Sequence, residues 1–74
     1  MNKDFIRNEI KSYIAKTGNT ITSVVDKINK NRSEENKMSA QNLSNKLSRG
    51  TIKYSEVLEI AEAIDYKIVW LPKE

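Results

Sequence analysis

The sequence predicts a mainly α-helical fold, a bundle of four to five short helices with a short C-terminal β-strand. Apolar residues recur at spacings of three and four along most of the chain, and typical capping and stop residues separate the segments that contain them. The last apolar segment alternates instead, as a strand does. A chain of 74 residues has room for one domain, 1–74, with a small core.

The first two helices are predicted at residues 4–17 and 20–29. Gly18 is placed to end the first helix in a left-handed conformation, and Thr20 is placed to cap the second. The apolar stripe expected to face the core consists of Phe5, Ile6, Ile10, Tyr13 and Ile14 in the first helix. In the second it consists of Ile21, Val24, Val25 and Ile28.

An exposed loop is predicted at residues 30–37, where the sequence has no apolar side chain. A third helix is predicted at 40–49, because Ser39 is a strong N-cap and Gly50 a typical stop. One side of this helix carries Ala40, Leu43 and Leu47. The other side is polar and carries Gln41, Asn42, Asn45, Ser48 and Arg49.

The fourth helix is predicted at residues 55–64 and the strand at 66–71. The helix is amphipathic, with apolar positions Val57, Leu58, Ala61 and Ile64. In the strand, aromatic and β-branched residues occupy both faces, which is favourable only if the strand is paired or covered.

The composition argues against several classes of function. Without Cys or His, the chain has no thiolate or imidazole for a nucleophile pair or a zinc site, so we expect no catalysis, no cofactor and no metal. The absence of Cys fits a reducing compartment, and no apolar run approaches the length of a membrane span or forms a signal peptide. We therefore expect a cytoplasmic protein without a membrane partner.

Charge is distributed unevenly along the chain. The net charge is +3, yet residues 1–53 hold 11 basic and 5 acidic side chains, against 2 and 5 in residues 54–74. Residues 36–55 contain four basic side chains and no acidic one. Such a segment attracts phosphates, although a solvated basic face without a ligand is the alternative interpretation.

The segment 39–66, SAQNLSNKLSRGTIKYSEVLEIAEAIDY, resembles the lambda-repressor and Cro-like (Xre-type) helix-turn-helix DNA-binding domains. In that family a Ser-capped recognition helix is followed by an Arg-Gly turn and an apolar helix, and with the first helices the resemblance covers most of residues 4–66. It implies a lambda-repressor-like bundle that regulates transcription, as a small repressor of phage or mobile-element type. The chain departs from the family in the connection after the second helix, which is about eight residues longer than the usual turn.

The residues of the third helix suggest how such a domain reads duplex DNA. Its amide side chains are suited to the edge of adenine in the major groove, and the candidates for base readout are Gln41, Asn42 and Asn45. The candidates for phosphate contact are Thr20, Ser39, Lys46, Arg49, Thr51 and Lys53. Plain solvent exposure of these side chains remains the alternative.

The predicted strand suggests a homodimer, which would present two recognition helices to an inverted-repeat operator. The candidate interface residues are Tyr66, Ile68 and Trp70. In the alternative, this tail folds back on the first and fourth helices of its own chain. A protein-interaction module on the same fold, such as an antirepressor or an antitoxin-like partner, is the alternative to DNA binding.

Overall fold

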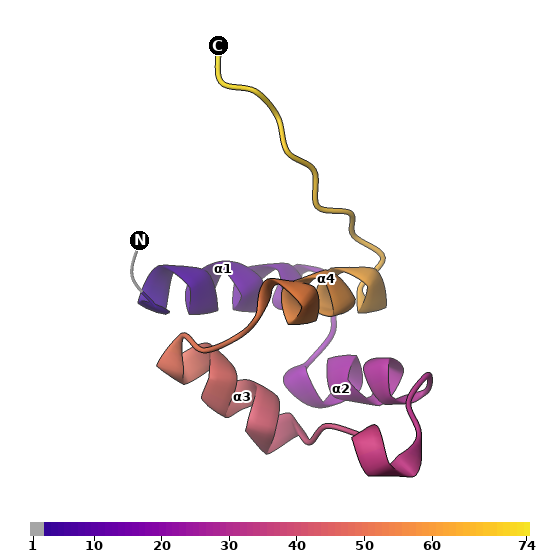
Figure 1. Ribbon diagram of the computed structural model, residues 1–74. Coiled ribbons are helices and arrows are strands. Elements are labelled where there is room, and N and C mark those ends of the chain that lie inside the picture. The colour runs from indigo at the N-terminus through magenta and orange to yellow at the C-terminus, as the bar shows by residue number, and fades with distance from the viewer. Residues whose placement is uncertain (1–2) are drawn as a thin grey trace.

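The computed structural model describes residues 3–74 and contains four α-helices in two layers. They are α1 (Lys3–Lys16), α2 (Ile21–Asn29), α3 (Ala40–Arg49) and α4 (Tyr54–Ala63), with a short 3₁₀ helix, η1 (Glu34–Asn36), between α2 and α3. Figure 1 shows α1 and α4 in one layer, with α2 and α3 below them. α3 packs against α1 and α2, and α4 packs against α2. The prediction of a mainly helical fold is confirmed.

The helix ends follow local signals in the sequence. α3 spans the expected residues, and the other three helices begin or end within one residue of the expected positions. Gly18 and Gly50 adopt left-handed conformations, with φ of 75° and 70°, after α1 and α3. Thr20 and Ser39 cap α2 and α3 through their side-chain oxygens.

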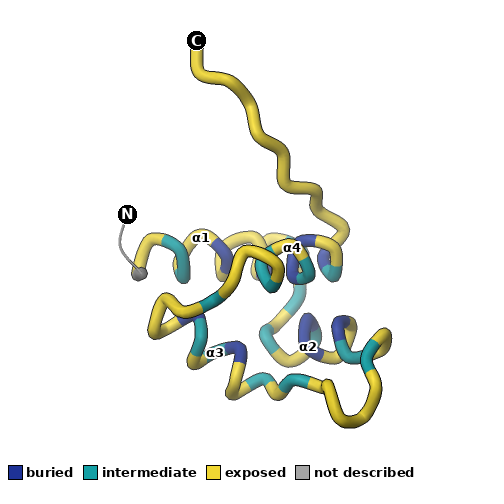
Figure 2. Tube along the Cα trace, viewed as in Figure 1, coloured by how far each residue is buried: buried dark blue, intermediate teal, exposed yellow. Residues whose placement is uncertain are grey.

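All four helices contribute to one core. The aliphatic side chains that it buries are Ile10, Ile14, Val24, Val25, Ile28, Leu43, Leu47, Ile60 and Ile64. Among these, the largest side chains that are fully buried are Val24 of α2 and Leu43 and Leu47 of α3. Figure 2 shows buried positions, in dark blue, on all four helices.

Three apolar side chains expected in the core are exposed instead. Phe5 and Tyr13 of α1 are 53% and 39% exposed, and Leu58 of α4 is 41% exposed. The buried stripe of α1 follows Ile10 and Ile14, one turn apart, whereas Phe5 and Tyr13 lie beside that stripe. On α4 the stripe passes through Ile60, and Leu58 faces away from it because two residues correspond to about 200° of helix rotation.

The expected C-terminal strand at 66–71 is not present in the described chain. Residues 64–74 contain no strand, and the tail, residues 66–74, runs away from the helices in an extended path and is exposed along its length (Figures 1 and 2). A strand requires a neighbouring strand to satisfy its backbone groups, and none of the residues 3–74 supplies one. Asp65, with φ of 61°, turns the chain away from the axis of α4.

Candidate nucleic-acid interface

The outer face of α3 is an exposed surface of amide side chains. Gln41, Asn42 and Asn45 are exposed, while Leu43 and Leu47 on the other face are 0% and 1% exposed. The Nε2 group of Gln41 donates a hydrogen bond to Oδ1 of Asn45, at 3.0 Å. The three residues expected to read bases therefore lie together on one exposed helix face, as their spacing predicts.

The N-termini of α3 and α2 are both capped by exposed hydroxyl residues. Oγ of Ser39 accepts a hydrogen bond from the backbone N–H of Asn42, at 3.0 Å. Oγ1 of Thr20 accepts from the N–H of Ser23, at 3.1 Å, and Oγ of Ser23 accepts from the N–H of Thr20, at 2.8 Å. This reciprocal pair was not predicted, although Thr followed by Ser three residues later was a visible signal.

The C-terminal half of α3 carries two cationic side chains, of which one is in an ion pair and the other is not. Arg49 is exposed and forms no ion pair with any residue in the range 3–74, whereas Lys46 forms an ion pair with Glu56 of α4. Thr51 and Lys53, in the connection to α4, are exposed. Arg49 therefore offers a charge to a ligand directly, while Lys46 first has to leave Glu56.

Glu56 of α4 is a carboxylate in contact with Lys46 of this surface, and its charge is compensated. Its side chain is 12% exposed, and burial alone would raise the pKa of this carboxyl. The hydrogen bonds from Lys46 and from the backbone N–H of Lys53, the second at 2.8 Å, outweigh burial and lower the pKa below the usual 4.5. The surface thus includes an ionised carboxylate that is paired and does not repel a phosphate as a free one would.

The tail contacts aromatic residues of its own chain. The rings of Tyr66 and Tyr13 meet edge to face, with centroids 5.4 Å apart, and Nε1 of Trp70 donates to the hydroxyl of Tyr54, at 3.2 Å. These contacts do not bury the tail, because Trp70 is 84% exposed and does not complete the core. A groove of about 470 Å³ between the tail, α1 and α4 is lined mostly by apolar side chains.

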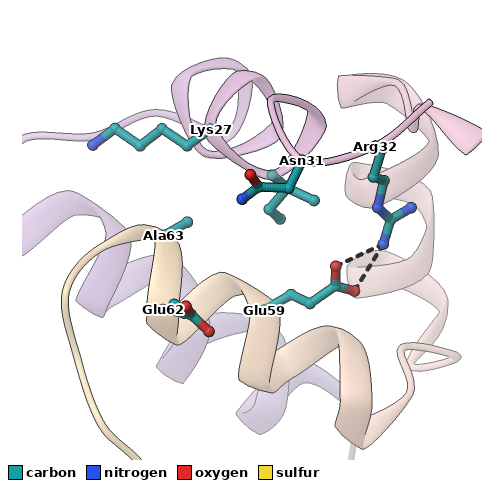
Figure 3. A pocket seen from close by; sticks show the side chains of 7 residues that line it. Lys27, Asn31, Arg32, Glu59, Glu62 and Ala63 are labelled. Carbon is teal, nitrogen blue, oxygen red and sulfur yellow. Dashed lines mark hydrogen bonds and ion pairs between the residues drawn. The ribbon is translucent and has the colours of Figure 1, made fainter. Parts of the chain in front are cut away.

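A second hollow, of about 370 Å³, lies between α2 and α4, and Figure 3 shows the side chains that line it. The paired side chains of Arg32 and Glu59 are part of its lining, and the other lining residues are Lys27, Ile28, Asn31, Glu62 and Ala63. The pairing of Arg32 with Glu59 leaves a wall of mixed charge, which favours neither an anion nor a cation.

Neither a metal centre nor a membrane segment is evident among the described residues. No group of three or more acidic, His or Cys side chains in residues 3–74 is arranged to hold a metal ion. None of the helices in this range is long and apolar enough to cross a bilayer.

Comparisons of the chain with protein-family models, with curated proteins and with solved structures found no match.

Proposed function

We propose that the protein binds duplex DNA through the outer face of α3 and acts as a transcription regulator. The observation that carries this proposal is the contrast between the two faces of α3. Leu43 and Leu47 fix one face in the core, while the other exposes amides, a hydroxyl and a guanidinium but no carboxylate. A helix of 10 residues is about 15 Å long and fits the major groove, which is about 12 Å wide.

The hydrogen bond between Gln41 and Asn45 leaves a defined set of groups for base readout. It uses Nε2 of Gln41 and Oδ1 of Asn45, so that the acceptor Oε1 of Gln41 and the donor Nδ2 of Asn45 remain. Adenine presents an acceptor at N7 and a donor at N6 in the major groove. The pair is therefore complementary to an adenine edge, and A·T base pairs are the expected targets of this part of α3.

Phosphate contacts come from groups around that face. Arg49 is exposed and has no ion pair within residues 3–74, Thr51 supplies a hydroxyl, and Lys53 adds a second exposed cation. Ser39 and Thr20 stand at helix N-termini, where the positive end of the helix dipole favours an anion. Lys46 is a weaker contributor because binding a phosphate requires it to give up Glu56.

A homodimer completes the proposal. Trp70 and Leu71 are 84% and 82% exposed, and pairing of the tail with the tail of a second copy covers them and supplies the missing strand partner. A two-fold dimer places two copies of α3 about 34 Å apart on one side of the duplex. With the resemblance to Cro-like domains, this arrangement favours a small repressor of phage or mobile-element type.

The test is selection of bound duplexes from a random pool at near-physiological salt. Enriched inverted repeats support a dimeric DNA reader, and absence of enrichment contradicts the proposal. On an enriched site, Asn42→Ala should cost about 1 to 3 kcal/mol of binding free energy and have little effect on random DNA. Asn8→Ala in α1 is the matched control, because Asn8 is also exposed and lies outside the proposed surface.

The phosphate contacts have a separate readout in the salt dependence of binding. Arg49→Gln should weaken binding to all sequences and reduce the slope of log K against log salt by about 1. Lys11→Gln removes one exposed charge from α1 and should leave the slope almost unchanged. Equal effects of the two variants would show that only net charge matters and would argue against a contact by Arg49.

The exposed tail also favours a second candidate, a protein-interaction module. Val69, Trp70 and Leu71 form a continuous apolar segment that a different protein is able to cover as well as a second copy. In that case the selection enriches no sequence, and biological function survives Asn42→Ala and Arg49→Gln but not truncation of the tail.

A further inference from the structure

The connection between α2 and α3, residues 30–39, is closed at its base by the side chain of Asn29. Nδ2 of Asn29 donates to the backbone carbonyl of Met38, at 2.8 Å, and Oδ1 accepts from the backbone N–H of Met38, at 2.9 Å. Asn29 is the last residue of α2, and Met38 directly precedes the N-cap of α3. The chain thus leaves α2 and returns to α3 at nearly the same place.

The rest of the connection is fastened to α4. Nη2 of Arg32 donates to both carboxylate oxygens of Glu59, each at 2.8 Å (Figure 3), and Nη1 donates to the carbonyl of Asn36, at 3.1 Å. Arg32 is half-buried, whereas the acidic residues of η1 point into solvent as exposed side chains. The connection is therefore an ordered loop with two attachments, even though every residue in 30–37 except Arg32 is exposed.

These contacts matter for α3 because a long connection by itself does not fix the angle between two helices. A short turn restricts that angle through its few backbone dihedrals, and each added residue relaxes the restriction. The hydrogen bonds between Asn29 and Met38 restore a short path, from the end of α2 through one side chain to the start of α3. Met38 also packs against the core, which anchors the same point from inside.

We propose that Asn29 is a positioning residue, which sets the placement of α3 relative to α2 in place of a tight turn. The consequence for DNA rests on the proposed function: Asn29 holds Asn42 and its neighbours in register with the capped N-terminus of α2 at Thr20. Residues 30–37 are looped out of this path and are held separately, by the contact of Arg32 with Glu59 of α4.

The experiment compares three variants with the wild-type chain on the selected DNA site. Asn29→Asp keeps the shape and the acceptor but loses the donor to Met38, and Asn29→Ala loses both hydrogen bonds. Asn31→Ala is the matched control, since the side chain of Asn31 makes no hydrogen bond with residues 3–74. Binding is measured at a temperature at which circular dichroism shows each variant to be folded.

We expect both variants of Asn29 to bind the selected site about tenfold more weakly, which equals about 1.4 kcal/mol, and to bind random DNA as the wild type does. Asn31→Ala should bind both as the wild type does. A purely structural role would lower the melting temperature and leave the affinity of the folded protein unchanged. Wild-type affinity of folded Asn29→Asp for the selected site would overturn the inference.

Amide hydrogen exchange of Met38 tests the same contact without DNA. Met38 is outside any helix, so protection of its N–H depends on Asn29, and Asn29→Ala should speed its exchange at least about tenfold. An unchanged exchange rate would contradict the positioning role. If the wild type selects no DNA sequence but the protection of Met38 depends on Asn29, the proposed function fails and the positioning of α3 stands.

Discussion

The two ends of α3 are held in place by different chemistry. At the N-terminal end the contacts are neutral: the hydroxyl of Ser39 caps the helix, and the amide of Asn29 pairs with Met38. At the C-terminal end, Gly50 closes the helix in a left-handed conformation, and an ion pair joins Lys46 to Glu56 of α4.

This difference predicts that conditions act unequally on the two ends. Neutral hydrogen bonds are nearly independent of pH and salt in the ordinary range, whereas an ion pair weakens with salt and is lost when its carboxylate is protonated. The half of α3 that carries Gln41 and Asn42 should therefore keep its position under conditions that loosen the half that carries Arg49.

The largest effect is expected from breaking the ion pair at the C-terminal end. Glu56→Gln keeps an acceptor for the N–H of Lys53 but removes the charge that holds Lys46, and should lower the free energy of unfolding by about 1 to 2 kcal/mol. Urea unfolding at pH 7 measures this. Glu35→Gln is the control, because Glu35 is exposed and forms no ion pair within residues 3–74.

The same variant sharpens the comparison through its pH dependence. The pKa of Glu56 is lowered in the folded chain, so its stabilising contribution is complete above the usual 4.5 and is lost as the pH falls through the lower folded value. The stability of the wild type should thus decrease below about pH 4.5 more steeply than that of Glu56→Gln.

In Lys46→Met the pKa of Glu56 should rise, because the effect of burial is then opposed by fewer favourable contacts. An NMR titration of the carboxyl carbon of Glu56 reports the direction of this shift.

The comparison also shows which features the sequence predicted and which it did not. Ser39 and Gly50 act locally, and the period of Leu43 and Leu47 reveals the buried face of α3, so both the helix and its polar face were predictable. The pairing of Arg32 with Glu59, 27 residues apart, depends on how α4 packs, and no local pattern contains that information.

The errors have the same origin. The exposure of Phe5 and Leu58 depends on the directions of neighbouring helices, because an apolar stripe shows that a face exists but does not fix its edges. The strand expected at 66–71 depends on a partner strand, which the sequence of one chain does not supply. The bounds and the buried face of α3 were predicted correctly because its core residues, Leu43 and Leu47, are spaced four residues apart within one helix.

A smaller effect is expected at the left-handed position that ends α3. Gly50 has φ of 70°, where a side chain is unfavourable, and Gly50→Ala should lower the free energy of unfolding by about 1 kcal/mol. In this variant the backbone hydrogen bond from the N–H of Thr51 to the carbonyl of Lys46, at 3.0 Å, should also weaken. Faster amide exchange at Thr51 with unchanged exchange at Met38 would show that the two ends respond separately, and equal changes would show that α3 loosens as a whole.

The smallest effect, of opposite sign, is expected at the end of α4. Asp65 occupies a left-handed position with φ of 61°, and the N–H of Tyr66 donates to the carbonyl of Ala61, at 2.8 Å, as in the turns that follow Gly18 and Gly50. Asp tolerates this conformation less well than Gly does, so Asp65→Gly should raise the free energy of unfolding by about 0.5 to 1 kcal/mol. The control is Asp65→Asn, which keeps the shape of the side chain and removes its charge, and so separates the backbone effect from electrostatics. Asp26→Gly would not serve, because Asp26 lies inside α2, where Gly destabilises the helix itself. A gain in Asp65→Asn equal to that in Asp65→Gly would assign the effect to charge at the C-terminal end of a helix, and a gain only in Asp65→Gly would assign it to backbone strain.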